Sequence, residues 1–263
     1  MKDEIHRSAK QALKGGVMDA EVYDGDMIEA FASWSKPSVE RILDISIGKL
    51  IALSPQTKFY PPGSSWRDAA QGLHCDGWDK SRDKIVSYFT SDLLDTSFPA
   101  MGSSSELRIG FVGGAVYCRL GNHRAAAAKA WLAGNHGESA VFKKARSYYC
   151  DIVPKLKELM QMCVEKGYGL KYSHAPDNHF KLPIQFSYNL VMVERGASNF
   201  DLYDLNSLYD SLEPIETGSL FSRLLKLDTR SKCARRQFQE VPIGLIKIML
   251  DDSEAIELFG VEK

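Results

Sequence analysis

The stretch Val116–Trp131, with the sequence VYCRLGNHRAAAAKAW, most limits what this chain can fold into. Its first half alternates apolar and polar side chains, which is typical of a β-strand, and its second half is an alanine-rich helix former. Only Gly121 and Asn122 separate the two parts, so the chain must turn sharply from a strand into a helix. Because alanine side chains are small, that helix can lie close against a sheet. The stretch therefore predicts an α/β architecture.

The rest of the chain adds further elements to this architecture. Alternating runs around Gly113–Gly114 predict a β-hairpin, and Arg41–Leu53 predicts a strand. Pro154 and Gly167 bound a predicted helix, and the segments IQFSYNLVMVERG and PIGLIKIMLDDSEAIELF are a strand and a helix candidate. We expect an α/β (α+β) fold with a small mixed sheet, packed helices and a C-terminal mixed α/β extension. The expected division is a loosely helical arm at 1–39, a domain at 40–167 and the extension at 168–263.

The turn between strand and helix has the chemistry of an anion site. Gly121 is free to turn tightly, Asn122 is a suitable N-cap, and the N–H groups of the first helical turn point at whatever lies in front of them. The helix dipole and the donors of His123 and Arg124 favour a phosphate group there. In the alternative interpretation, Gly121 only turns the chain and the two side chains lie on an exposed helix start. If the site is real, Arg124→Ala weakens phosphate binding and leaves folding unchanged.

The order of strand, Pro/Ser-rich loop, helix, hairpin, Gly-Asn-His-Arg and alanine-rich helix resembles the ParB/sulfiredoxin-like superfamily from about residue 40 to about residue 155. Members of that superfamily place a Gly-x-His/Arg-Arg motif at the start of a helix that follows a hairpin. The resemblance implies a small α/β fold in which this helix holds the phosphates of a nucleotide, ATP or CTP, with Mg²⁺ as a further cofactor. It also implies that a loop from the first part of the domain closes over the nucleotide.

The resemblance transfers unevenly to single residues. Gly121, His123 and Arg124 match the phosphate-binding part of the superfamily motif. Asn122 stands where sulfiredoxins carry their reactive cysteine, which excludes sulfinic acid repair. Leu120 stands where kinase-like members have an acidic residue, which argues against direct phosphotransfer of their type.

The loop KFYPPGSSWRD lies where similar proteins keep a loop that faces the nucleotide. By this location alone, further phosphate-binding candidates are Lys58, Ser64, Ser65 and Arg67. Cleavage of a phosphate bond needs a positioned carboxylate or cation, for which Asp68 or Asp44 is a candidate. The alternative is a solvated, proline-rich loop. The catalytic candidates are His123, Arg124 and Asp68.

Two other clusters have residue types that could form a site. The segment SHAPDNH carries His174, Asp177 and His179, but their uneven spacing matches no standard metal site, and we predict no metal ligand there. The run TRSKCARRQ contains four basic residues that could contact the DNA backbone, and the alternative is that they form a charged helix face. These residues are Arg230, Lys232, Arg235 and Arg236.

Composition narrows the class of partner. The formal net charge of −1 and the isoelectric point of about 6.6 favour a small ligand or a protein over DNA. An odd number of cysteines, five, without paired spacing indicates reduced thiols. The sequence shows neither a signal-peptide pattern nor an apolar run long enough to span a membrane, so we expect a cytoplasmic protein without a membrane partner.

Together these observations favour a nucleotide-binding protein that hydrolyses a nucleotide phosphate bond at a helix N-terminus. A nucleotide-gated DNA-binding protein or nuclease is the first alternative. A non-catalytic interaction scaffold is the second.

Overall fold

The computed structural model describes residues 1–35, 37–54, 60–100, 106–174, 189–196, 199–215 and 238–261. The chain divides into two compact units: unit 1 comprises Met1–Cys150 and Asp252–Lys263, and unit 2 comprises Asp151–Asp251. This division differs from the ranges expected from the sequence, because residues 1–39 belong to unit 1 and the break falls at residue 150 instead of 167. The C-terminal segment returns to unit 1, where Phe259 packs on Phe111 and Tyr149 with ring centroids 5.0 and 5.4 Å apart.

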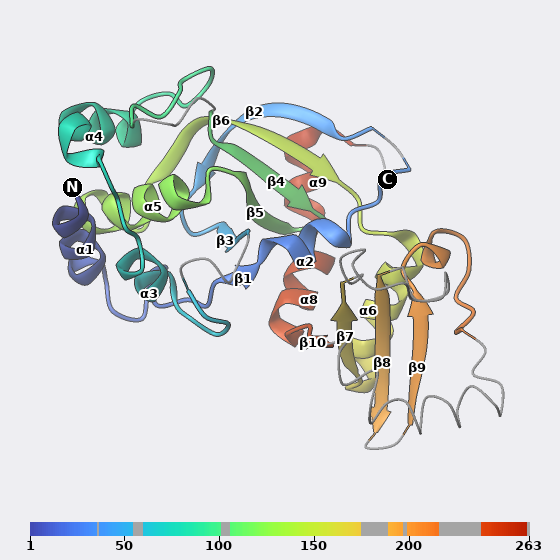
Figure 1. The fold of residues 1–263 in the computed structure, drawn as a ribbon. Helices are drawn as coiled ribbons and strands as arrows, with labels where there is room; N and C mark the ends of the chain where they lie inside the picture. Colours follow the sequence, from blue (N-terminus) through green and yellow to red (C-terminus); the bar gives the residue numbers. More distant parts are fainter. Residues whose placement is uncertain are drawn as a thin grey trace, which may run out of the picture. The chain divides into compact units, whose positions relative to one another are not determined.

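Unit 1 is built on a mixed six-stranded sheet, which agrees with the expected mixed α/β fold (Figure 1). The strand order is β1-β3-β5-β4-β6-β2. The pairs β1–β3, β3–β5 and β4–β6 are parallel, whereas β4–β5 and β2–β6 are antiparallel. The predicted hairpin is the pair β4–β5. The strands are β1 (Tyr23–Asp24), β2 (Val39–Ser46), β3 (Leu50–Leu53), β4 (Arg108–Val112), β5 (Ala115–Leu120) and β6 (Val141–Cys150).

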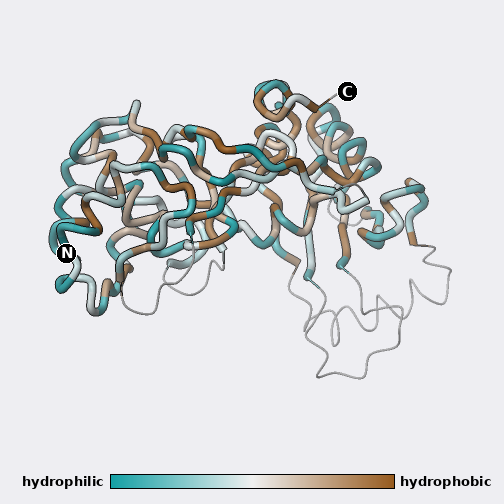
Figure 2. The backbone as a smooth tube through the Cα atoms, turned by 90° about the horizontal axis from the view of Figure 1, so that it is seen from above, coloured by the Kyte–Doolittle hydropathy of each residue, from teal (hydrophilic) through white to brown (hydrophobic). Residues whose placement is uncertain are grey.

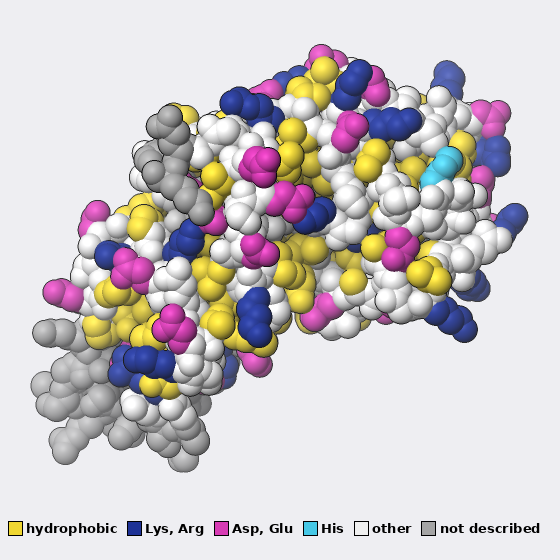
Figure 3. All heavy atoms as spheres, turned by 180° about the vertical axis from the view of Figure 1, so that it is seen from behind, with side chains coloured by type: hydrophobic (Ala, Val, Ile, Leu, Met, Phe, Trp, Pro, Cys, Tyr) yellow, Lys and Arg dark blue, Asp and Glu magenta, His cyan; other side chains and the backbone are white. Residues whose placement is uncertain are grey.

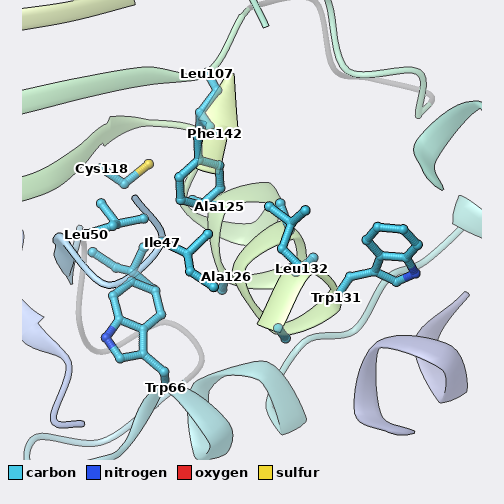
Figure 4. Packing of buried hydrophobic residues seen from close by; sticks show 14 of the residues in the cluster. Ile47, Leu50, Trp66, Leu107, Cys118, Ala125, Ala126, Trp131, Leu132 and Phe142 are labelled. Carbon is cyan, nitrogen blue, oxygen red and sulfur yellow. The ribbon is translucent and has the colours of Figure 1, made fainter. Parts of the chain in front are cut away.

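Helix α5 (Asn122–His136) provides the centre of the core of unit 1. Its alanines, Ala125–Ala128, Ala130 and Ala133, are at most 5% exposed. Figure 4 shows Ala125 and Ala126 close to the side chains of Phe142, Ile47 and Leu50. The small side chains therefore bring the helix close to the sheet, as the sequence predicted. The other helices of the unit are α1 (Lys2–Gln11), α2 (Gly25–Ala30), α3 (Trp66–Gln71), a 3₁₀ helix (Trp78–Ser81), α4 (Arg82–Thr90) and α9 (Ser253–Phe259).

The N-terminal segment is part of this core, although the sequence predicted a separate arm. Helix α1 is largely hydrophilic along its length (Figure 2), but Ile5 and Ala9 are fully buried. The segment after α1 is held by Arg67, whose guanidinium donates to the carboxylate of Asp19 and to backbone oxygens that include that of Leu13. The buried face of α1, which also includes Ser8, packs against α5.

The closest approach of α1 to α5 is at Gly134, where there is no room for a side chain: a Cβ would lie 2.3 Å from the backbone oxygen of Ser8. In an open helix, Gly→Ala stabilises by about 1 kcal/mol through helix propensity. Here we expect Gly134→Ala to destabilise unit 1 by about 1–2 kcal/mol in urea unfolding, because a backbone atom cannot move aside as a side chain can. His136→Ala, at an exposed position of α5, is the control and should be neutral. An equally or more stable Gly134→Ala protein would show that α1 does not pack there.

Unit 2 contains an antiparallel four-stranded sheet in the order β10-β7-β8-β9, with the helices α6 (Pro154–Lys166) and α8 (Ile243–Leu250). Helix α6 begins at Pro154, and Gly167 ends it with a φ of +67°, as predicted. The helix candidate near the C-terminus is two helices, because α8 ends at Leu250 and α9 begins in unit 1. The strands are β7 (Gly169–Ser173), β8 (Leu190–Gly196), β9 (Asn199–Asp204) and β10 (Gln239–Glu240), and a 3₁₀ helix spans Ser207–Tyr209.

Within the described part of the chain, none of the helices combines the length and the apolar character that a membrane span requires.

Candidate functional site

Three parallel strands of unit 1 end at one edge of the sheet. Strands β1, β3 and β5 lie side by side in this order and end at Asp24, Leu53 and Leu120. Helix α2 follows the first strand, Ser54 follows the second, and Gly121 leads the third into α5. In α/β sheets, ligands bind in front of the carboxyl ends of parallel strands. The predicted phosphate-binding junction therefore lies at the edge of the sheet where a ligand is expected.

Gly121 is the N-cap of α5 and has a φ of +102°, in the left-handed region that favours glycine. A Cβ at this position would lie 2.3 Å from Nε of Arg124, so a side chain here would displace the guanidinium. Asn122, which the sequence suggested as N-cap, is the first residue of the helix instead. Its Oδ1 accepts a hydrogen bond of 2.9 Å from the backbone N–H of Ser54. This bond joins the end of β3 to the start of α5.

Arg124 differs most from its predicted role, because its side chain is only 7% exposed. Its guanidinium lies against Gly121 and near Tyr88 and Cys118. Burial raises the pKa of the Tyr88 hydroxyl and that of the Cys118 thiol to about 12, and the positive charge of Arg124 opposes both increases. The arginine therefore puts a cation beneath the helix start and does not extend from an exposed surface. The neighbouring His123 is the exposed side chain of the pair.

The loop residues suggested as ligands mostly have structural roles. Lys58 lies outside the described residues. Ser64 is buried, and its backbone oxygen accepts the N–H of Val22 at 2.9 Å. Ser65 and Asp68 form a capping box at the start of α3: the Asp68 N–H donates to the Ser65 hydroxyl, and the Ser65 N–H donates to the Asp68 carboxylate. The Ser65 hydroxyl, which donates to the Asp68 carboxylate at 2.7 Å, and the Ser65 N–H lower the pKa of Asp68, which makes it a weak base.

The two remaining loop and strand candidates also have partners away from this edge. Nε of Arg67 donates to Asp19 at 2.6 Å, which ties α3 to the N-terminal segment. Asp44, the second carboxylate suggested as a base, accepts the N–H of Lys144 at 2.8 Å where the register of β2 and β6 shifts. The structure thus assigns both residues to the fold.

A buried lysine that the sequence argument missed lies on α5. Lys129 is 1% exposed, and its ammonium donates to the backbone oxygen of Leu50 at 2.7 Å and lies 3.8 Å from the centre of the Trp66 ring. Burial lowers its pKa well below the usual value, and the negative charge of Glu138 opposes this shift. A single lysine within the run AAAAKAW is the signal that could have identified it, since the surrounding alanines are buried.

The structure describes only a small part of the two other predicted clusters, the segment SHAPDNH and the basic run 230–236. His174 accepts or donates a hydrogen bond with the Tyr172 hydroxyl at 3.0 Å, and its two suggested partners lie outside the described residues. Among the residues that are described, no three His, Cys, Asp or Glu side chains gather as a metal site. The basic run 230–236 also lies outside them. On the face drawn in Figure 3, positive and negative side chains are interspersed.

Comparison with protein families, with curated proteins and with solved structures finds no match to this chain. The resemblance to the ParB/sulfiredoxin-like superfamily therefore stays a prediction from the sequence. Function has to be inferred from the residues at the strand edge themselves.

Proposed function

We propose that unit 1 binds the phosphate groups of a nucleotide, ATP or CTP, at the junction of β5 and α5. The observation that carries this proposal is the conformation of Gly121, a left-handed N-cap without a side chain, at the carboxyl end of a parallel strand. A backbone in this form lets a ligand approach the first turn of the helix closely.

Two sources of positive potential act at this turn. Helix α5 has 15 residues, and its dipole places partial positive charge at its N-terminus. The buried guanidinium of Arg124 adds a full charge directly behind Gly121, where the low dielectric of the core weakens its screening. Neither charge depends on an exposed, mobile side chain, so the site is arranged before a ligand arrives.

Hydrolysis of the bound nucleotide is the second part of the proposal. Asp68 belongs to the capping box of α3, and Asp44 is engaged between β2 and β6. Of the catalytic candidates, His123 is the exposed side chain next to Gly121 and can stabilise charge that develops on a phosphate oxygen. We therefore propose binding as the main activity and cleavage of a phosphate bond as its accompaniment.

The binding proposal is tested by thermal unfolding with ATP, CTP, ADP and GTP at millimolar concentration, each with and without Mg²⁺. A ligand that binds only the folded protein stabilises it by about 2.7 kcal/mol at a hundredfold excess over its Kd. At least one nucleotide should raise the unfolding temperature. If none does so under either condition, the phosphate-site proposal is wrong.

His123→Ala separates ligand contact from folding. Since the side chain is exposed, we expect the free energy of unfolding to change by less than about 0.5 kcal/mol. Loss of a charge-assisted hydrogen bond to phosphate should weaken nucleotide affinity about tenfold in calorimetry. The matched control is His136→Ala, because His136 is an exposed histidine at the opposite end of the same helix. Equal affinity of the two variants would remove His123 from the site.

A further inference from the structure

The hydroxyl of Ser54 is a buried polar group without a hydrogen bond to any of the described residues. Ser54 is 9% exposed, and within the part of the chain that the structure describes its Oγ is hidden from solvent and has no hydrogen-bond partner. Buried polar groups in native proteins are almost always paired, so each exception needs an explanation. The backbone of the same residue is paired, since its N–H donates to Oδ1 of Asn122. The residue is thus fixed in place while its side chain stays unsatisfied.

The position of Ser54 connects this hydroxyl with the proposed phosphate site. Strand β3 lies between β1 and β5, so Ser54 stands between the turn into α2 and the turn into α5. The hydroxyl lies over Gly25, where a Cβ would come within 2.3 Å of Oγ. The hydrogen bond to Asn122 holds the other side of Ser54 against the first residue of α5. Gly25 on one side and the first residue of α5 on the other thus fix Ser54 at this edge.

We propose that the Ser54 hydroxyl donates a hydrogen bond to a phosphate oxygen of the ligand held at the start of α5. This inference rests on the proposed function and adds a second strand end to its site. A bound phosphate supplies the partner that the hydroxyl lacks among the described residues.

The surrounding charges favour a phosphate oxygen over a metal ion as that partner. The nearest carboxylate along the edge, Asp24, accepts hydrogen bonds from the N–H groups of Asp26 and Met27 at 2.9 and 3.4 Å and so caps α2. On the other side, Gly121 and Arg124 place positive charge at the start of α5. A hydroxyl between a capped carboxylate and a positive helix start serves best as a donor to an anion.

The test compares Ser54→Ala with Ser147→Ala. Ser147 is a fully buried serine of β6 whose hydroxyl is satisfied, donating to the backbone oxygen of Ala145 at 3.0 Å. Calorimetry with ATP, CTP and inorganic pyrophosphate, each with and without Mg²⁺, measures affinity, and urea unfolding measures stability. We expect Ser54→Ala to bind about tenfold more weakly while its unfolding midpoint stays equal or rises. Ser147→Ala should show the reverse, with a lower midpoint and unchanged affinity.

The outcomes distinguish this inference from the proposed function. If the wild-type protein binds none of the probes, the proposed function is wrong, and the Ser54 contact, which depends on it, is wrong too. If the wild-type protein binds a probe and Ser54→Ala binds it equally well, only the Ser54 contact is wrong. A lowered unfolding midpoint of Ser54→Ala would show that the hydroxyl serves the fold, and an affinity loss confined to the Mg²⁺ samples would assign it to the cation. Both results overturn the assignment to a phosphate oxygen.

Discussion

Replacing Arg124 with alanine is expected to lower the free energy of unfolding by about 3 kcal/mol. This value is typical of substitutions that replace a large side chain in a protein core with a small one. Arg124 is 7% exposed, so the substitution removes a long aliphatic stem from the interior and leaves a cavity between α5 and Tyr88. It also removes the guanidinium that lies against Gly121. Urea unfolding followed by circular dichroism measures the loss.

Two variants separate the causes of this loss. Arg124→Met keeps most of the apolar volume without the charge, and we expect it to lose less than half as much stability as Arg124→Ala. His123→Ala, one residue earlier but exposed, should unfold like the wild-type protein. If Arg124→Ala is as stable as His123→Ala, Arg124 lies at the surface, as the sequence first suggested, and the buried charge behind Gly121 is absent.

Local signals predicted the elements that they encode. The Gly113–Gly114 turn predicted the hairpin of β4 and β5, and Gly121 predicted the turn into α5. Pro154 and Gly167 predicted the ends of α6. In each case the residue fixes its own backbone conformation, so the information lies within a few positions of the sequence.

The capping box of α3 was also encoded locally, but it was interpreted as chemistry. Ser65 and Asp68 have the three-residue spacing by which a serine N-cap and an acidic side chain satisfy each other's N–H groups. The hydrogen bonds of this cap occupy the hydroxyl of Ser65 and the carboxylate of Asp68, so the two side chains serve the start of α3.

What the sequence could not show depends on contacts between distant segments. The pairing of β1 with β3 brings Asp24 beside Leu53, and no local pattern encodes a partner about thirty residues away. The inward orientation of Arg124 depends on Tyr88, which lies on a different helix. The unsatisfied hydroxyl of Ser54 likewise becomes visible only when the neighbours at the edge are in place.

Lys129 gives the second large expected effect, a dependence of stability on pH. Burial lowers the pKa of this lysine in the folded protein well below the usual value of 10.5. Between these two values the unfolded chain binds a proton that the folded protein does not, so the free energy of unfolding rises with pH in that window. The limiting slope is about 1.4 kcal/mol per pH unit, or about 2.8 kcal/mol over two units.

Lys129→Met isolates this contribution, because methionine retains the length of the side chain and cannot titrate. Urea unfolding at a series of pH values below 10.5 should show wild-type stability rising with pH relative to Lys129→Met, with the limiting slope as the upper bound. Buried thiols act in the opposite direction at high pH, since burial raises the pKa of Cys75 and Cys163 to about 11, but both proteins share them and the difference cancels. Parallel curves for the two proteins would mean that Lys129 keeps its proton in the core, stabilised by the Leu50 oxygen and the face of Trp66.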